Sequence, residues 1–213
     1  MEDFLKETVF IDYHSDEIQE IIAPFKDKNS SKKELAKQVY LKIRDGYRYY
    51  PYRVGLKDEH YKASLISKQT KGNCIEKSII FIACMRALGI PARLRLAKVK
   101  NHIGIEKFEE KFQTNEITPH GMAEVYLNNK WIKASPAFNK ELCDYCNVAP
   151  LAFDGENDSL FQEFDKNGGK FMEYIEDYSY FGDVPVDFII ENIYQNYPHI
   201  ESLFKGKDEI LID

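Results

Sequence analysis

One cysteine in this 213-residue sequence has surroundings that suit nucleophilic chemistry. Cys74 follows Gly72-Asn73 and opens an apolar segment that continues to Leu88. A cysteine in the first turn of a helix meets unpaired backbone N–H groups and the positive end of the helix dipole. Both favour the thiolate, so we expect the pKa of Cys74 to lie below that of a free cysteine. The same N–H groups, including that of Cys74, can hold the oxyanion that forms when a thiolate attacks a carbonyl carbon.

A nucleophilic thiol needs a base, and His120 is the best placed of the five histidines because it begins a segment that alternates like a strand. The other three cysteines suit other roles. Cys84 lies inside the apolar segment and is expected to be a small core residue. Cys143 and Cys146 form a single pair with no second pair nearby, so we expect no metal site and no cofactor.

Residues 120–127 and 130–134 are predicted to form a hairpin around Asn128-Asn129, because asparagine tolerates the positive φ of a two-residue turn. In that register Leu127 opposes Lys130, and His120 falls opposite Ala137 if the pairing continues. Side chains alternate between faces, so Ser135 and Asn139 would share the face of His120. Both are therefore candidates to orient the His120 ring.

The remaining patterns predict an α+β domain. A capping signal at Ser31 begins a helix that ends near Asp45-Gly46, and residues 74–88 form a buried helix. Strands are expected over residues 8–11 and 92–99, and helices from about residue 15 to 22 and from about 184 to 197. The aromatic run 47–52, which includes Tyr49, is either a packing cluster or the wall of a substrate cleft.

Composition narrows the classes of partner. The net charge of −6 and the pI of about 5.5 argue against nucleic-acid binding, which needs a basic surplus. No window approaches the roughly 20 apolar residues of a membrane span, and the acidic start Met1-Glu2-Asp3 is unlike a signal peptide. We therefore expect a cytoplasmic protein with reduced thiols and no membrane partner. The sequence leaves the oligomeric state open.

Four motifs together resemble the transglutaminase-like superfamily over about residues 30–140. They are Gly72 to Lys77 around the cysteine, Arg86 to Arg93 with its Gly-Ile-Pro-Ala-Arg turn, His120 to Val125, and Trp131 to Pro136. Their order and spacing both agree with the family. The expected organisation is an N-terminal arm (1–30), the transglutaminase-like core (31–140) and a C-terminal extension packed on the same domain (141–213).

The resemblance implies a papain-like α+β fold, with the nucleophile at the start of a buried helix packed on an antiparallel sheet and a cysteine, histidine and aspartate triad. Cys74 and His120 match the first two members, whereas Ser135 stands where the family has its aspartate. Asn139 is the alternative third member, as asparagine is in papain-like proteases. Gln69 stands roughly where papain-like enzymes have an oxyanion-hole glutamine, and Trp131 and Tyr49 are candidates for the cleft wall.

The function that this implies is cysteine-dependent acyl transfer through a Cys74 thioester, on a peptide or protein amide. Release by water would make the protein a protease, amidase or deamidase, and release by an amine would make it a transglutaminase. Resemblance to bacterial members favours hydrolysis. The alternative is a non-catalytic domain that binds a peptide or protein partner, because the family's aspartate is absent.

Overall fold

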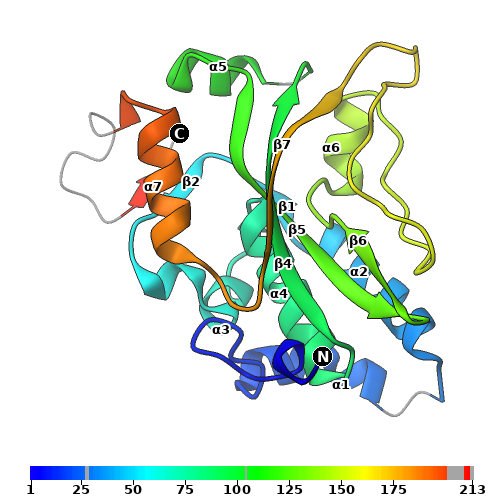
Figure 1. Cartoon of the computed structure of the whole chain (residues 1–213). Coiled ribbons are helices and arrows are strands. Elements are labelled where there is room, and N and C mark those ends of the chain that lie inside the picture. The colour runs from blue at the N-terminus through cyan, green and yellow to red at the C-terminus, as the bar shows by residue number, and fades with distance from the viewer. Residues whose placement is uncertain (27–28, 104, 201–208, 212–213) are drawn as a thin grey trace.

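The chain folds around a four-stranded antiparallel sheet in the order β6-β5-β4-β7, as the computed structural model shows (Figure 1). The structure describes residues 1–26, 29–103, 105–200 and 209–211. The strands are β4 (Ala92–Asn101), β5 (Glu116–Leu127), β6 (Lys130–Ala134) and β7 (Met172–Phe181). β4 pairs with both β5 and β7 and therefore lies in the middle of the sheet.

The helix that begins at Cys74, α4 (Cys74–Ala87), packs on β5 and β4 and forms the centre of the core. Every residue from 74 to 86 is buried, which fits a helix that is apolar on most faces. Its charged residues are compensated inside the protein. Glu76 pairs with Arg53, Lys77 donates to three backbone carbonyls, and Arg86 donates to the carbonyls of Lys6, Ala92 and Gly182.

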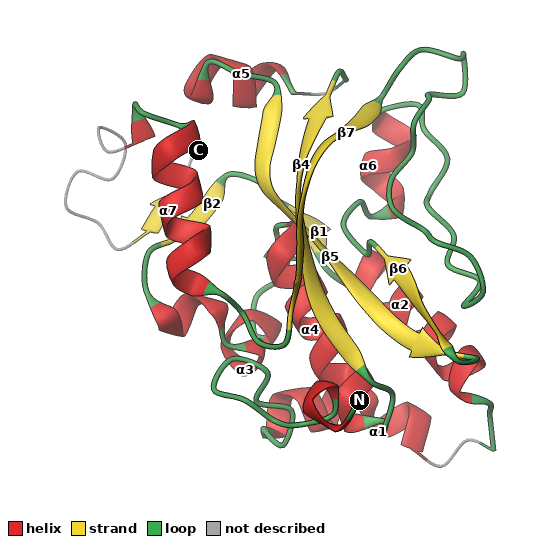
Figure 2. Cartoon of the chain, in the orientation of Figure 1, coloured by secondary structure: helices red, strands yellow, loops and turns green. Residues whose placement is uncertain are grey.

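Three helices pack against α4, namely α1 (Asp16–Lys26), α2 (Lys32–Gly46) and α3 (Ala63–Ser67). Figure 2 shows α7 (Val186–Asn196) to the left of the sheet in this view and α6 (Lys140–Tyr145) to the right. The other helical elements are η1 (Glu2–Phe4), η2 (Asp58–Tyr61) and α5 (Glu106–Phe112). No helix among the described residues is long and apolar enough to cross a bilayer.

Two short sheets complete the fold near the start of α4. β1 (Arg48–Tyr49) runs parallel to β3 (Lys71–Gly72), with Tyr49 beside Gly72. β2 (Arg53–Gly55) pairs with β8 (Glu209–Leu211) in the antiparallel sense. Since β3 ends two residues before Cys74, the first of these sheets fixes Tyr49 relative to the start of α4.

Local sequence signals identified the longer helices and three of the four strands of the main sheet. Ser31 caps α2 by accepting the backbone N–H of Glu34, as predicted. The strand expected over residues 8–11 was wrong. There, the Thr8 hydroxyl accepts the N–H of Ile11, and the Thr8 N–H donates to the Ile11 carbonyl. These local contacts close a turn, so the segment has no neighbouring strand to extend along.

The predicted hairpin is confirmed over its first residues. Leu127 opposes Lys130, and Asn128 and Asn129 have φ values of 50° and 63°. The pairing ends at Ala134, however, because the next residue changes partner: the N–H of Ser135 donates to the carbonyl of Ser159. The pairing that would have brought Ala137 opposite His120 therefore does not form.

Candidate active site

The thiol of Cys74 lies at the N-terminus of α4, held by a capping box. The Asn73 side chain accepts the N–H of Glu76, and the Glu76 carboxylate accepts the N–H of Asn73. Arg53 pairs with the same carboxylate. The capping box and Arg53 together fix the start of the helix. Cys74 itself is only 4% exposed.

The strand that carries His120 touches this thiol. The backbone N–H of Gly121 donates to the Cys74 Sγ at 3.4 Å. A Cβ at position 121 would lie 2.7 Å from the Cα of Ile75, so only glycine allows this approach of β5 to α4. The role of Gly121 was not predicted from the sequence, although a glycine inside a strand and beside a candidate base is a recognisable signal.

The expectation that Cys74 is acidic in the resting protein was wrong. Burial raises the pKa of the Cys74 thiol to about 11, against the lowering effect of hydrogen bonds from the N–H groups of Gly121, Ile75 and Cys74. The helix N-terminus does act in the expected direction. Removing the thiolate from water is the larger effect, so the resting group is a neutral thiol.

His120 is buried, and neither of its ring nitrogens has a hydrogen-bond partner among the described residues. Burial lowers the pKa of His120 to about 4, so the imidazole is neutral at physiological pH. Cys74 and His120 are therefore not joined by a hydrogen bond in this structure. A buried imidazole without a hydrogen-bond partner lowers the stability of the protein. This indicates that the His120 ring finds its partner in another state of the protein than the resting one.

The predicted contact between His120 and Ser135 or Asn139 is not present. The Asn139 amide is used elsewhere: its oxygen accepts the N–H of Tyr49 at 2.9 Å, and its nitrogen donates to Glu141 at 2.6 Å. The expected alternation of side chains along the hairpin does not extend to Asn139, because the chain leaves β5 after Ala134. Ser135 is buried and lines the same small cavity as His120, but it does not hydrogen-bond the ring.

Two further candidates lie away from the thiol. Gln69 is exposed in the turn after α3 and does not line the cavity at Cys74. Trp131 packs against the Arg93 guanidinium, 3.9 Å from the ring centroid, and against Phe4. It lines neither cavity near Cys74, so the cleft-wall interpretation does not hold for Trp131.

Tyr49, by contrast, lies where two cavities meet. A cavity of about 60 Å³ contains Cys74, and a groove of about 870 Å³ runs beside it. Both are lined by Tyr49, Pro51, Phe108 and Ile117. The aromatic run 47–52 therefore combines its two expected roles, because Tyr49 packs edge-to-face on Phe138 and also lines the groove.

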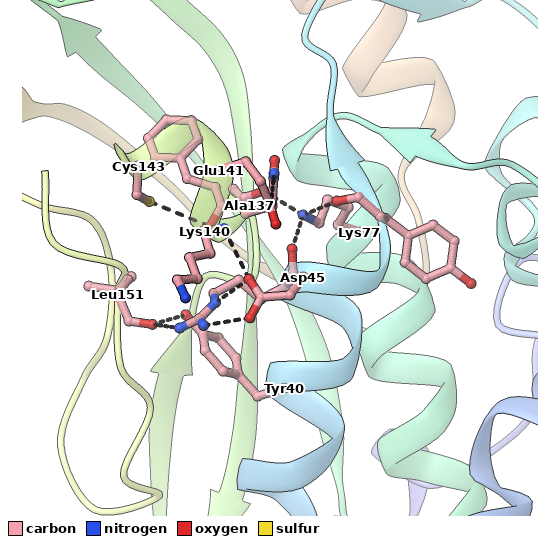
Figure 3. Close-up of polar contacts among 12 residues, drawn as sticks. Tyr40, Asp45, Lys77, Ala137, Lys140, Glu141, Cys143 and Leu151 are labelled. Carbon is pink, nitrogen blue, oxygen red and sulfur yellow. Dashed lines mark hydrogen bonds and ion pairs between the residues drawn. The ribbon is translucent and has the colours of Figure 1, made fainter. Parts of the chain in front are cut away.

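A buried lysine supports this region, and this role was not predicted from the sequence. Lys77 Nζ donates to the carbonyls of Arg44, Tyr47 and Ala137 at 2.8, 2.8 and 2.6 Å. Figure 3 shows Lys77 beside Asp45 and Ala137, between α2 and the segment that leads to α6. Burial lowers the pKa of Lys77 to about 7. The available signal was a lysine within a helix whose residues are mostly apolar and buried.

Around Lys77, further contacts join the same segments. Asp45 pairs with Arg44 and accepts the backbone N–H of Lys140, while Arg44 donates to the Leu151 carbonyl, as Figure 3 shows. The end of α2, the start of α6 and the loop at residue 151 are thereby held together. The end of α2 and the start of α6 line one part of the groove.

Of the other thiols, Cys146 lines the large groove, whereas Cys84 and Cys143 line neither cavity near Cys74. Cys84 is fully buried within α4, where burial raises its pKa to about 12. Cys143 and Cys146 are reduced, and burial raises the pKa of both. Among the described residues, no three His, Cys, Asp or Glu side chains are grouped closely enough to hold a metal ion.

Comparison with known proteins gives one family. The model of the transglutaminase-like superfamily matches residues 19–136. No curated protein matches the chain. Among solved structures, a "putative cysteine protease" from Cytophaga hutchinsonii is similar, with 16% sequence identity and a TM-score of 0.47. The alignment covers 81% of this chain and 62% of that one, so this chain spans less than two thirds of its length.

Proposed function

Because the chain belongs to the transglutaminase-like superfamily, we propose that it is a cysteine-dependent enzyme that transfers the acyl group of an amide to water. One observation carries the proposal: a thiol at a helix N-terminus touches the strand residue next to His120 and faces a cavity beside a large groove. The proposed nucleophile thus lies beside the proposed substrate space, and the proposed base is the residue before Gly121 on β5.

In the proposed reaction, His120 carries the proton of the thiol to the leaving amine. His120 takes the proton of the Cys74 thiol as Sγ attacks the carbonyl carbon, and the carbonyl oxygen becomes an oxyanion. The intermediate collapses, the C–N bond breaks, and His120 returns the proton to the leaving amine. Water then hydrolyses the thioester with His120 again as the base. An amine in place of water would give transamidation.

Proton transfer requires a rearrangement from the resting structure. Cys74 and His120 are both neutral at rest, and the His120 ring has no hydrogen-bond partner. The missing Cβ of Gly121 faces α4, so the side chain of the adjacent His120 leaves β5 on the opposite face, and its buried ring must reorient to reach the thiol when substrate enters. This agrees with the general finding that catalytic hydrogen bonds tighten only in the complex.

The groove favours a peptide or protein segment as substrate. Its volume of about 870 Å³ lies within the range of ligand sites. Its aromatic lining residues are Tyr49, Tyr50, Tyr52, Phe108, Phe138, Tyr145 and Phe171. Asp45, Glu141, Arg48 and Lys107 add charges of both signs. This mixture of aromatic and charged side chains suits an extended chain with varied side chains better than a small uniform ligand.

A non-catalytic role is the second candidate. In its favour, position 135 carries no charge, and the pKa of His120 is lowered to about 4 by burial alone. An imidazolium formed there would lack the carboxylate that stabilises it in an aspartate triad. In this case the groove would bind a peptide that is never cleaved.

A library of peptide amides and glutamine-containing peptides, incubated with the wild type, Cys74→Ala and Cys84→Ala, tests the proposal. We expect consumption by the wild type and Cys84→Ala, and none by Cys74→Ala. Mass spectrometry of a trapped acyl adduct on Cys74 would identify the thioester. Equal consumption by wild type and Cys74→Ala would reject the enzyme, and binding without consumption would support the second candidate.

A further inference from the structure

The cavity that contains Cys74 differs in character from the groove beside it, because its walls are mainly apolar and aromatic. Three elements supply most of the apolar wall: Phe108 and Phe112 come from α5, Ile117 from β5, and Ile189 and Ile193 from α7. Arg53 is the one charged residue among the described residues that line the cavity, and its guanidinium is paired with Glu76. A group bonded to the Cys74 sulfur therefore lies against apolar side chains.

The hydroxyl groups of this cavity are mostly engaged already. The Tyr197 hydroxyl donates to the Glu116 carbonyl at 2.9 Å and accepts the N–H of Thr118 at 2.8 Å. The Tyr61 hydroxyl donates to a backbone carbonyl at 3.0 Å. The Tyr49 hydroxyl, where the cavity meets the groove, makes no hydrogen bond with the described residues. A carboxamide that entered the cavity would therefore leave water and find too few partners for its donors and acceptor.

The wall that α7 contributes is specific to this chain, since α7 lies outside the residues 19–136 that match the family. Ile189 and Ile193 are four residues apart, so both project from the same face of the helix, and both are buried. Two polar contacts fix that face on β5. Asn192 accepts the Thr118 hydroxyl at 2.8 Å, and the Tyr197 hydroxyl binds the backbone of β5.

The size of the cavity limits what it can hold. Its volume is about 60 Å³, and a single water needs about 10–15 Å³ by the same measure, so it takes roughly four to six groups of that size. The side chains of leucine and methionine fall in this range, whereas a longer piece of peptide does not. The rest of a peptide has space in the groove, which shares Tyr49, Pro51, Phe108 and Ile117 with the cavity.

We propose that this cavity binds the side chain of the residue whose carbonyl Cys74 attacks, so that the substrate is a peptide cut after an aliphatic residue of the size of leucine or methionine. The inference rests on the proposed acyl transfer. The bond from Sγ to the carbonyl carbon forms, the C–N bond breaks, and the thiol proton leaves with the amine. The aliphatic side chain stays in the cavity until water hydrolyses the thioester. Ile193 on α7 is a residue that determines this specificity.

Three p-nitrophenyl esters test the proposal, those of N-acetylalanine, N-acetylmethionine and N-acetylglutamine, with release of nitrophenolate as the measure of kcat/KM. Burial of each methylene-sized group favours the transition state about fourfold, so we expect the methionine ester to react about 10- to 100-fold faster than the alanine ester. Methionine and glutamine side chains have similar lengths. The glutamine ester should nevertheless be about 10- to 100-fold slower than the methionine ester, because its carboxamide stays without enough partners.

Two variants of Ile193 assign the preference to the cavity. Ile193→Phe places a larger side chain in it, so the ratio of the methionine rate to the alanine rate should fall to about one. Ile193→Ala enlarges the cavity, so the ester of N-acetylphenylalanine should react at least tenfold faster than with the wild type, and this arm stands if Ile193→Phe does not fold. Gln195→Phe is the matched control, because Gln195 is exposed on the same helix and lines neither cavity. It should keep the wild-type ratio.

The outcomes separate the specificity from the proposed function. Hydrolysis that Cys74→Ala abolishes, with equal rates for the three esters or a faster glutamine ester, would overturn the aliphatic pocket and leave the enzyme intact. A methionine preference that both Ile193 variants retain would also overturn the assignment to this cavity. If the wild type hydrolyses none of the esters in a way that Cys74→Ala abolishes, the proposed function fails, and the pocket fails with it.

Discussion

The backbone N–H of Gly121 lies 3.4 Å from the Sγ of Cys74, and this contact joins the strand of the candidate base to the helix of the candidate nucleophile. It exists because β5 approaches α4 so closely that residue 121 has no room for a Cβ. The distance between β5 and α4 is therefore set by the lack of a side chain at Gly121. A polar contact between Cys74 and His120 does not set it.

Gly121→Ala should destabilise the protein by about 1–3 kcal/mol, the usual effect of inserting a methyl group into a packed core. The added Cβ would lie 2.7 Å from the Cα of Ile75, so β5 must move away from α4. Denaturant midpoints measure the effect. Gly46→Ala is the control, because a Cβ there meets nothing within 4 Å. Equal midpoints for both variants would show that β5 and α4 are not in contact as described.

The resting thiol should resist alkylation at neutral pH. Burial raises the pKa of Cys74 to about 11, so the rate of iodoacetamide labelling should rise with pH through that value. A free thiol has its midpoint near 8.5, about 2.5 pH units lower. Peptide mapping after labelling separates Cys74 from Cys84, Cys143 and Cys146. A midpoint below 8 would mean that the helix N-terminus and its N–H groups outweigh burial.

The elements of this fold were predictable where the signal is local. The Ser31 cap, the Asn128-Asn129 turn and the apolar residues that follow Cys74 each determine an element through neighbouring residues, and the structure contains all three. The strand expected over residues 8–11 failed because β-type residues form a strand only beside a partner. Whether a partner exists depends on residues far away in the chain.

The candidate site was predictable only in part, for the same reason. Cys74 could be placed on a helix N-terminus because Gly72-Asn73 precedes it and an apolar segment follows it. The environment of His120 was not predictable, since it depends on the chain turning at Ser135 to pair with Ser159. The acidity of Cys74 was misjudged because a sequence gives the helix terminus but not the depth of burial.

Lys77→Met should lower the free energy of unfolding by on the order of 3 kcal/mol, because three buried carbonyls lose the amino group that donates to all of them. The apolar replacement preserves packing in α4, so the loss reports the polar contacts. Thermal and chemical unfolding measure it, and Lys42→Met on the exposed face of α2 is the control. A stability equal to that of the control would mean that the carbonyls find other donors. Since Lys77 lies beside the groove wall, amide turnover should also fall.

Ser135→Asp should raise the pKa of His120 above its resting value of about 4, because a carboxylate in the shared cavity favours the imidazolium. A base is deprotonated above its pKa, so the acid limb of kcat/KM should shift upward in pH by the same amount as the pKa. The plateau rate should also rise, because a more basic imidazole accepts the thiol proton more readily. An NMR titration of the His120 ring and the pH–rate profile measure the two effects. Ser135→Asn, with similar shape and no charge, should leave both unchanged. If Ser135→Asp raises the pKa of His120 and the acid limb does not follow, His120 is not the base. If neither the pKa of His120 nor the acid limb changes, the side chain at position 135 does not reach the His120 ring.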